Sequence, residues 1–535
     1  MSTKLTTMWT AINSTINRWM NGSLFFRGFT AVLDFFKRLC GSSFIARAFV
    51  ADSDPLDDSI KRSYFAAFVH AMFNRLPKPV TAPAHWNGTL SKLVSGSWLI
   101  GGTCDAFGIP IPQPAEIKQS LFGIKAILQW LLFIFPVVGM MAVLFAVPFL
   151  PTMLLAAMLV PILFLILLSR SFVIDSTTVF LLIFIILSMI AAVASLAPRS
   201  SIQIALLTSI FMLSVPAVVA CCTTRKSAEL LIIIFVVSAG ITGLYGVFQA
   251  LTGATLDIWQ DQELFADTAG RVSSTFGNPN VYGTYLLLAI PIAAACIVYL
   301  KGFFFKFCAV GATGLLLISL MLTLSRGCFL SLALAVGIFV LIMEKRLVIL
   351  FVPAVLALPF VLPQTILNRV LSIFNMADTS TAFRLNIWQG SLRILQDFWL
   401  SGVGQGIDAY NAVYPFYALA AIHAPHSHSL YIQYLVEVGV VGFAVFIIVL
   451  ACFFRTMVNF LRHTTDFKQR VMAAAMIAAV IGFLFQGVTD FVFYNYRVLL
   501  TFYLFIGISI AFTRVNKPVI TAEKIKSELV SNYHD

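Results

Sequence analysis

Twelve long apolar runs constrain the fold of this chain more than any other feature of its sequence. A helix needs about 20 apolar residues to cross the hydrocarbon core of a bilayer, and the runs approach or reach that length. Hydrophobic residues make up 60% of the 535 residues and charged residues only 11%, which excludes an ordinary soluble globular protein. We therefore predict an all-α polytopic membrane protein. The predicted spans are roughly 126–148, 151–169, 177–197, 201–222, 228–251, 281–300, 303–325, 327–343, 347–362, 429–454, 471–490 and 496–513.

Basic residues between the spans predict the orientation. If the N-terminus is cytoplasmic, the inner loops hold eleven Lys and Arg, whereas the outer loops hold seven Arg and no Lys. An excess of positive charge on the cytoplasmic side is typical of membrane proteins. The net charge of +12 therefore indicates an inner membrane surface and not a nucleic-acid partner. The outer set is Arg199, Arg271, Arg326, Arg369, Arg384, Arg393 and Arg497.

The sequence divides into three parts. Residues 1–120 carry basic amphipathic patterns, with Trp9 and Trp19 on apolar helical faces. Such a region fits the surface of an anionic leaflet or a small cytosolic domain. Residues 121–513 hold the spans, and residues 514–535 form a predicted cytoplasmic tail. The long segment 363–427, between the ninth and tenth spans, is predicted to lie on the outer face and to be partly helical.

Three of the seven histidines, His423, His426 and His428, lie within six residues at the end of this outer segment. Ionisable groups at a membrane boundary indicate a functional site, and histidine exchanges protons near neutral pH. His426 and His428 could bind a metal, but no further ligand has suitable spacing. They could also cap the tenth helix. A general base is the third interpretation, favoured by the nearby arginines.

Two outward arginines stand out. Arg326 lies between two spans with almost no loop, so its charge must face a polar cavity or a partner. Arg384 lies in a predicted amphipathic helix, 383–398, four residues before Trp388, where it is a surface neighbour of the indole. Arginine binds phosphate oxygens in pairs, although contacts with lipid headgroups would also explain arginines here. The predicted apolar stripe of this helix is Leu385, Trp388, Leu392 and Leu395.

A turn before the sixth span contains Asn278 and Asn280, which could bond a sugar or simply form the turn. Arg271, just upstream, is a candidate for a phosphate site. The Gly402–Gly406 segment superficially resembles a nucleotide-binding loop. It follows no predicted strand, so a turn is the better interpretation.

The last spans add further candidates. Glu437 lies deep in the tenth span, an unusual place for a carboxylate, and could orient a histidine or an arginine. Asp490 and Arg497 flank the last outer turn and could pair with each other.

Several of these motifs together resemble the O-antigen ligase and O-antigen polymerase superfamily over about residues 228–513. Upstream landmarks are Phe276–Asn280 and Leu324–Gly327. The later ones are Arg384-Leu-Asn-Ile-Trp388, Gly402-Val-Gly-Gln-Gly406, His426-Ser-His428-Ser, Tyr431-Ile-Gln-Tyr-Leu-Val-Glu437-Val-Gly439 and Gly442. The first 120 residues fall outside the resemblance.

The resemblance implies a glycosyltransferase at the outer face of the cytoplasmic membrane, with both termini cytoplasmic. Its donor would be a glycan on undecaprenyl diphosphate. Its acceptor would be lipid A-core in a ligase or another lipid-linked repeat in a polymerase. The superfamily's essential arginines and histidine correspond to Arg326, Arg384 and either His428 or His426. The expected partners are these lipid-linked substrates and membrane lipids, with no cofactor and no nucleic acid.

The hypothesis for the mechanism follows from these residues. Arg326 and Arg384 would stabilise the negative charge on the leaving diphosphate, with Arg271 assisting. His428 or His426 would accept the proton of the attacking hydroxyl, which predicts inversion without a metal. The expected substrate-binding set is Arg271, Asn278, Asn280, Trp388, Glu437 and Arg497. A transporter or flippase for lipid-linked sugars is the main alternative, but it would place charges near the bilayer midplane.

Overall fold

The computed structural model describes residues 175–253, 270–344, 379–419 and 424–516. Over these ranges the chain is helical and contains no strand. The helices are α10 Ser176–Val193, α11 Pro198–Met212, α12 Ser214–Cys221, α13 Arg225–Thr252, η3 Ser274–Phe276, α14 Pro279–Tyr299, α15 Phe303–Leu322, α16 Arg326–Met343, α19 Thr379–Phe398, α20 Ile407–Val413, η6 Tyr414–Phe416, α21 Leu430–His463, α22 Phe467–Gln486 and α23 Tyr496–Val515.

Nine helical segments in the described ranges are long and apolar enough to cross a membrane, with α11 and α12 together forming one of them. They correspond to nine of the predicted spans, so the all-α polytopic class is confirmed for this part of the chain. The predicted spans 126–148, 151–169 and 347–362 lie outside the described residues. The same holds for residues 1–120, most of the tail 514–535 and part of the segment 363–427.

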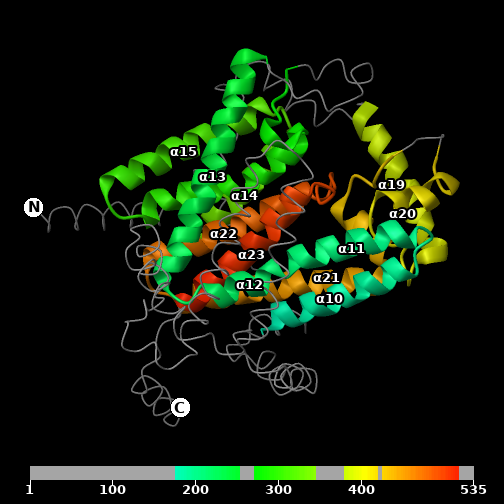
Figure 1. Ribbon diagram of the computed structural model, residues 1–535. Helices are drawn as coiled ribbons and strands as arrows, with labels where there is room; N and C mark the ends of the chain where they lie inside the picture. Colours follow the sequence, from blue (N-terminus) through cyan, green and yellow to red (C-terminus); the bar gives the residue numbers. More distant parts are fainter. Residues whose placement is uncertain (1–174, 254–269, 345–378, 420–423, 517–535) are drawn as a thin grey trace, which may run out of the picture.

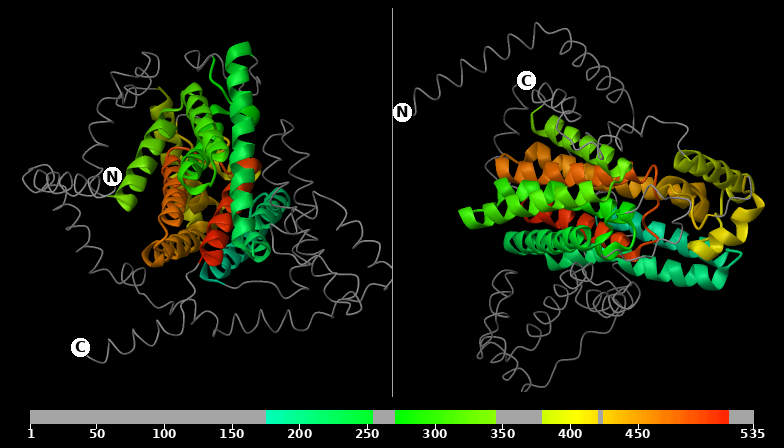
Figure 2. Two further views of the ribbon diagram at one scale, coloured as in Figure 1. Left: turned by 90° about the vertical axis from the view of Figure 1, so that its left-hand side faces the viewer. Right: turned by 90° about the horizontal axis from the view of Figure 1, so that it is seen from above.

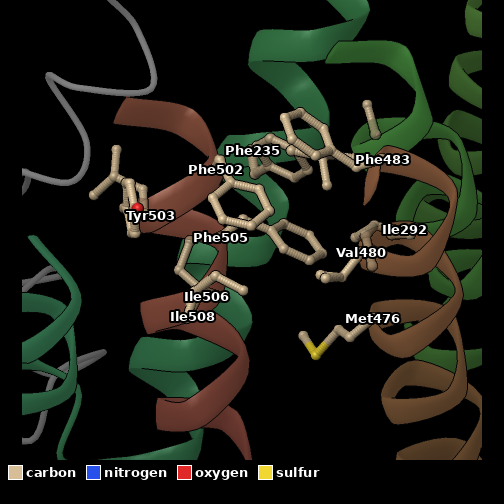
Figure 3. Packing of buried hydrophobic residues seen from close by; sticks show 14 of the residues in the cluster. Phe235, Ile292, Met476, Val480, Phe483, Phe502, Tyr503, Phe505, Ile506 and Ile508 are labelled. Atoms are coloured by element: carbon tan, nitrogen blue, oxygen red, sulfur yellow. The ribbon is translucent and has the colours of Figure 1, made fainter. Parts of the chain in front are cut away.

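The centre of the bundle is formed by α14, α22 and α23. In the most apolar stretch of these three helices, 78%, 83% and 89% of the residues are buried. The corresponding values are 22% for α15 and 17% for α16. Figure 1 shows α22 and α23 between α13–α15 on one side and α10, α12 and α21 on the other. Aromatic side chains fill the centre, including Phe483 and Phe502 with ring centroids 4.7 Å apart (Figure 3). The peripheral α15 and α16 therefore offer apolar surface that suits lipid.

The segment with α19, α20 and η6 lies at one end of the bundle (Figures 1 and 2). It has a small core of its own, to which α19 contributes Ile387 and Ile394. The predicted helix is confirmed, but its protein-facing side is not the predicted stripe, because Leu385 and Leu392 are both 46% exposed.

Loops that the charge pattern assigned to the outer face meet at this same end. The Leu430 backbone N–H donates to the Gly487 carbonyl at 2.7 Å, which joins the start of α21 to the end of α22. The Arg497 guanidinium donates to the Thr275 carbonyl. At the opposite end, the Tyr299 hydroxyl donates to Glu229 at 2.8 Å. The folded chain thus gathers the candidate residues at one end of the bundle.

Candidate active site at one end of the helix bundle

A tight turn from His426 to Ser429 leads into α21. His428 has a left-handed backbone, with φ of 51°, and its N–H donates to Nδ1 of His426 at 3.2 Å. Because Nδ1 accepts this bond, neutral His426 carries its proton on Nε2. His426 is 6% exposed. Burial is the main reason that the pKa of His426 is lowered to about 3. Repulsion from His428 and Arg384 adds to the lowering, and attraction to Asp490 opposes it.

His428 is the more accessible histidine and faces a carboxylate. Its Nδ1 lies 3.8 Å from Oδ1 of Asp490, within ion-pair range. The side chain of His428 is 26% exposed and that of Asp490 is 7% exposed. Burial raises the pKa of Asp490, but the neighbouring His428, Arg384 and His426 together hold it below its usual value. This arrangement occupies Nδ1 of His428 and leaves Nε2 to act on a substrate.

Aromatic rings hold the two histidines in place. Tyr494 stacks on His426 with ring centroids 4.9 Å apart. The Tyr494 hydroxyl in turn accepts a hydrogen bond from the Asn278 side chain at 3.1 Å. Phe383, immediately before Arg384 in α19, makes an edge contact with His428 at 6.4 Å between centroids. Asn278 therefore reaches the histidine turn indirectly, through Tyr494.

The arginines approach this turn from different elements. Arg384 on α19 lies close enough to affect the charges of both His426 and Asp490. Arg326 is the first residue of α16 and is partly exposed. Arg384 is therefore the arginine that the structure places most directly beside the histidines.

Arg271 supports the turn that precedes Arg326. Its Nε donates to the Thr323 carbonyl and its Nη2 to Oδ1 of Asn280, both at 2.7 Å. The turn contains Leu324 in a left-handed conformation, with φ of 50°. The two bonds use different nitrogens of the guanidinium, so Arg271 and Asn280 act together as a brace for the start of α16.

Three further residues of the predicted substrate-binding set make no direct contact with the histidine turn among the contacts that the structure shows. Arg497 is buried and holds the Thr275 carbonyl. The pairing of Arg497 with Asp490 considered from the sequence is wrong, because Asp490 faces His428. Trp388 is half-buried, and its indole N–H has no hydrogen-bond partner among the residues that the structure describes. Glu437 is buried behind the turn, where it accepts a hydrogen bond from Gln433 at 3.0 Å.

The glycine-rich segment after α19 forms a turn, as predicted, and it clamps a break in α21. The break lies at Gly439, with φ of 67° and ψ of 179°. Backbone N–H groups of Val403 and Gly404 donate to the carbonyls of Val436 and Glu437 at 2.9 and 3.0 Å. On the other side of the break, the Val440 N–H donates to the Trp399 carbonyl at 2.8 Å. Backbone groups freed by the break are thus satisfied by the clamp.

Residues 311–447 match the family model for O-antigen ligase. This part of the chain is similar to the O-antigen ligase family. The match confirms the resemblance seen in the sequence and covers α16, α19, the glycine turn, the histidine turn and the outer part of α21. Together with the nine long apolar helices of the described ranges, the match indicates a multi-pass membrane protein. A comparison with curated proteins found no match.

The O-antigen ligase match ends before Asp490, so the partner of His428 lies outside it. Sequence reasoning placed Asp490 at the outer turn without connecting it to a histidine 62 positions earlier. A buried acidic residue in a loop between two apolar spans is the available signal, because such a group needs a partner. Gln433 was missed as well, since a glutamine near the start of a span resembles an ordinary interfacial residue.

Across the described ranges, no group of three or more His, Cys, Asp or Glu side chains gathers closely enough to hold a metal ion. Behind the histidine turn lies a small cavity of about 50 Å³, lined among others by His426, Gln433 and Glu437. A cavity needs about 10–15 Å³ of such volume to hold one water molecule, so this one has room for a few waters. Of the two histidines, His428 has the more exposed side chain and is the more open to an approaching substrate.

Proposed function

We propose that this protein is a membrane glycosyltransferase that moves a glycan from an undecaprenyl diphosphate carrier to an acceptor hydroxyl at the outer face of the cytoplasmic membrane. The observation that carries the proposal is the pair of His428 and Asp490 beside Arg384. A carboxylate-oriented imidazole next to a fixed cation combines a base for a hydroxyl with a partner for a diphosphate. The O-antigen ligase match supports a membrane glycosyltransferase of this type.

The proposed reaction is a single displacement. His428 takes the proton from the acceptor hydroxyl as its oxygen attacks the anomeric carbon. The bond between that carbon and the diphosphate oxygen breaks, and the electron pair leaves with the undecaprenyl diphosphate. Attack from the face opposite the leaving group inverts the anomeric centre. Asp490 holds the imidazole and stabilises its protonated form.

The arginines stabilise the departing diphosphate. Arg384 has the most direct place, and Arg326, braced by Arg271, forms the other side of the proposed anion site. Oriented cations at developing charge lower the barrier without reorganising during the reaction. In this mechanism the arginines neutralise the diphosphate, so no metal is required. Trp388 and Asn280 remain proposed contacts for the substrate.

The assay is transfer in membranes supplied with lipid-linked donor. His428→Ala should lower the rate by about 10²- to 10⁴-fold, the usual contribution of a general base. His463→Ala is the matched control, because His463 lies at the opposite end of the same helix and is exposed. Full activity in His428→Ala would remove the base from the mechanism.

Two variants on the same helix, α19, test the role of the arginine. Arg384→Ala should cost about 10²- to 10³-fold, as expected for the loss of one oriented group that stabilises developing charge. Arg393 lies on α19 as well but is exposed, so Arg393→Ala should retain activity. Equal activity of the two variants would contradict a diphosphate site at Arg384. Deleting the gene and identifying the accumulated lipid-linked glycan would then distinguish ligation from polymerisation.

A further inference from the structure

A buried side chain of α21, which the proposed mechanism does not use, holds the histidine turn. The backbone N–H of Ser427, between the two histidines, donates to Oε1 of Gln433 at 2.7 Å. Ser427 is fully buried and Gln433 is 1% exposed, so water does not compete for this bond. A buried N–H left without a partner is destabilising. Gln433 therefore fixes the middle of the turn.

The orientation of the Gln433 amide is set by a second bond. Its Nε2 donates to Oε1 of Glu437 at 3.0 Å, one helical turn further along α21. The same carboxylate oxygen accepts the backbone N–H of Gly406 at 3.3 Å. With Nε2 directed at an acceptor, Oε1 must face Ser427. The amide cannot flip without losing both bonds.

These bonds form one chain between the two sides of the site. It runs from the histidine turn through Gln433 and Glu437 to Gly406. Gly406 belongs to the glycine turn that follows α19, the helix that carries Arg384. The base and the proposed diphosphate partner are thus connected through buried polar groups as well as through the backbone clamp at Gly439.

The turn needs such support because its backbone is strained. A non-glycine residue in the left-handed region, as His428 is, is strained and persists only where its surroundings enforce it. The local bond from His428 N–H to His426 Nδ1 and the bond from Ser427 N–H to Gln433 both enforce it. Of these, only the bond to Gln433 ties the turn to a regular helix.

We propose that Gln433 is a positioning residue for His428, and that Glu437 acts by orienting the Gln433 amide instead of binding substrate. This inference rests on the proposed function, in which His428 is the base. Without Gln433 the turn relaxes and the His428 ring moves away from Asp490. Misplacement of a catalytic group by about 1 Å can cost about 10²-fold in rate. The donor still meets its arginines, so the loss falls on kcat and not on the KM for the donor.

The test uses matched variants of the full-length protein in membranes. Gln433→Met keeps the length of the side chain but removes both bonds, and kcat should fall by at least 10-fold with an unchanged donor KM. The midpoint of the acid limb of its pH–rate profile should also move, because the contact between His428 and Asp490 changes. Gln469→Met is the control, since Gln469 is a buried, hydrogen-bonded glutamine at the opposite end of the bundle.

Two variants of Glu437 separate orientation from charge and provide a second route if Gln433→Met does not fold. Glu437→Gln keeps an oxygen for both donors and should retain activity within about 2-fold, whereas Glu437→Leu should resemble Gln433→Met. Wild-type kcat and pH profile in both Gln433→Met and Glu437→Leu would overturn the inference, as would equal losses in Glu437→Gln and Glu437→Leu. Full activity in His428→Ala would instead overturn the proposed function.

Discussion

Acidification from neutral pH should destabilise this protein through His426. Burial lowers the pKa of the folded His426 to about 3, whereas an unfolded histidine titrates near 6.5. Between these values the unfolded chain binds a proton that the folded chain does not. The free energy of unfolding therefore decreases as the pH falls from about 6.5 towards about 3. At pH 5 the cost is about 2 kcal/mol, from 1.36 kcal/mol for each unit below 6.5.

The comparison that isolates this effect is wild type against His426→Asn. The Asn side-chain oxygen can take the place of Nδ1 and accept the His428 N–H, but the amide cannot be protonated. Asp490 also has a lowered pKa and so contributes in the same direction, but only below its usual range near pH 4. The difference between wild type and His426→Asn in thermal unfolding of the purified protein in neutral detergent, measured from pH 7.5 to 4.5, therefore isolates the contribution of His426. The wild type should lose about 2 kcal/mol more than His426→Asn between pH 6.5 and 5.

A second variant controls for histidines in general. His463 is exposed at the other end of α21, so His463→Asn should keep the pH dependence of the wild type. If wild type and His426→Asn lose stability equally on acidification, His426 is not buried in its neutral form. The assignment of His428 as the accessible base would then lose its main support.

Three further perturbations probe the supports of the site. Gly439→Ala should abolish the fold or lower activity by more than 10-fold, because its Cβ would lie 2.2 Å from the Leu400 carbonyl oxygen. Gly311→Ala is the control: it has open space around it and should leave expression and thermal stability unchanged. Arg271→Lys keeps the charge but cannot make both bonds of the fork, so transfer should fall by about 10-fold or more, and an unchanged rate would contradict the brace. Asp490→Asn should lower kcat by about 10²-fold or more with little change in KM, and a purely binding defect would refute its role beside His428.

The sequence predicted the spans well because hydropathy over some 20 residues is a strong signal. It failed where charge or glycine interrupts a helix without ending it. The tenth span was predicted to end at residue 454, yet α21 continues to His463, since Arg455 and Arg462 lower the hydropathy of a turn that remains helical. Gly439 lies within an apolar run, and only tertiary contacts show that the helix breaks there.

The sequence identified residues of the candidate site but not which of them contact each other. Motifs indicated Arg384 and His428 because arginine and histidine are rare on the outer side of an apolar chain. The pairing of His428 with Asp490 joins residues far apart in the sequence, and no local pattern encodes it. The predicted apolar stripe of α19 contains Leu385 and Leu392, whereas the residues that pack into the small core are Ile387 and Ile394. Hydropathy alone does not distinguish a helix face that contacts protein from one that contacts lipid.

The clamp around the break in α21 has a consequence for how such an enzyme can diversify. Its bonds join backbone to backbone, so they place no demand on most side chains between Trp399 and Gly404. Gly402 and Gly439 are the exceptions, because a Cβ on either would collide with a carbonyl of the other segment. In the proposed mechanism, substitutions on the exposed surface of the segment with α19, α20 and η6 would alter which acceptor is recognised while the base stays in place. The position of the base and the choice of acceptor would then be separable.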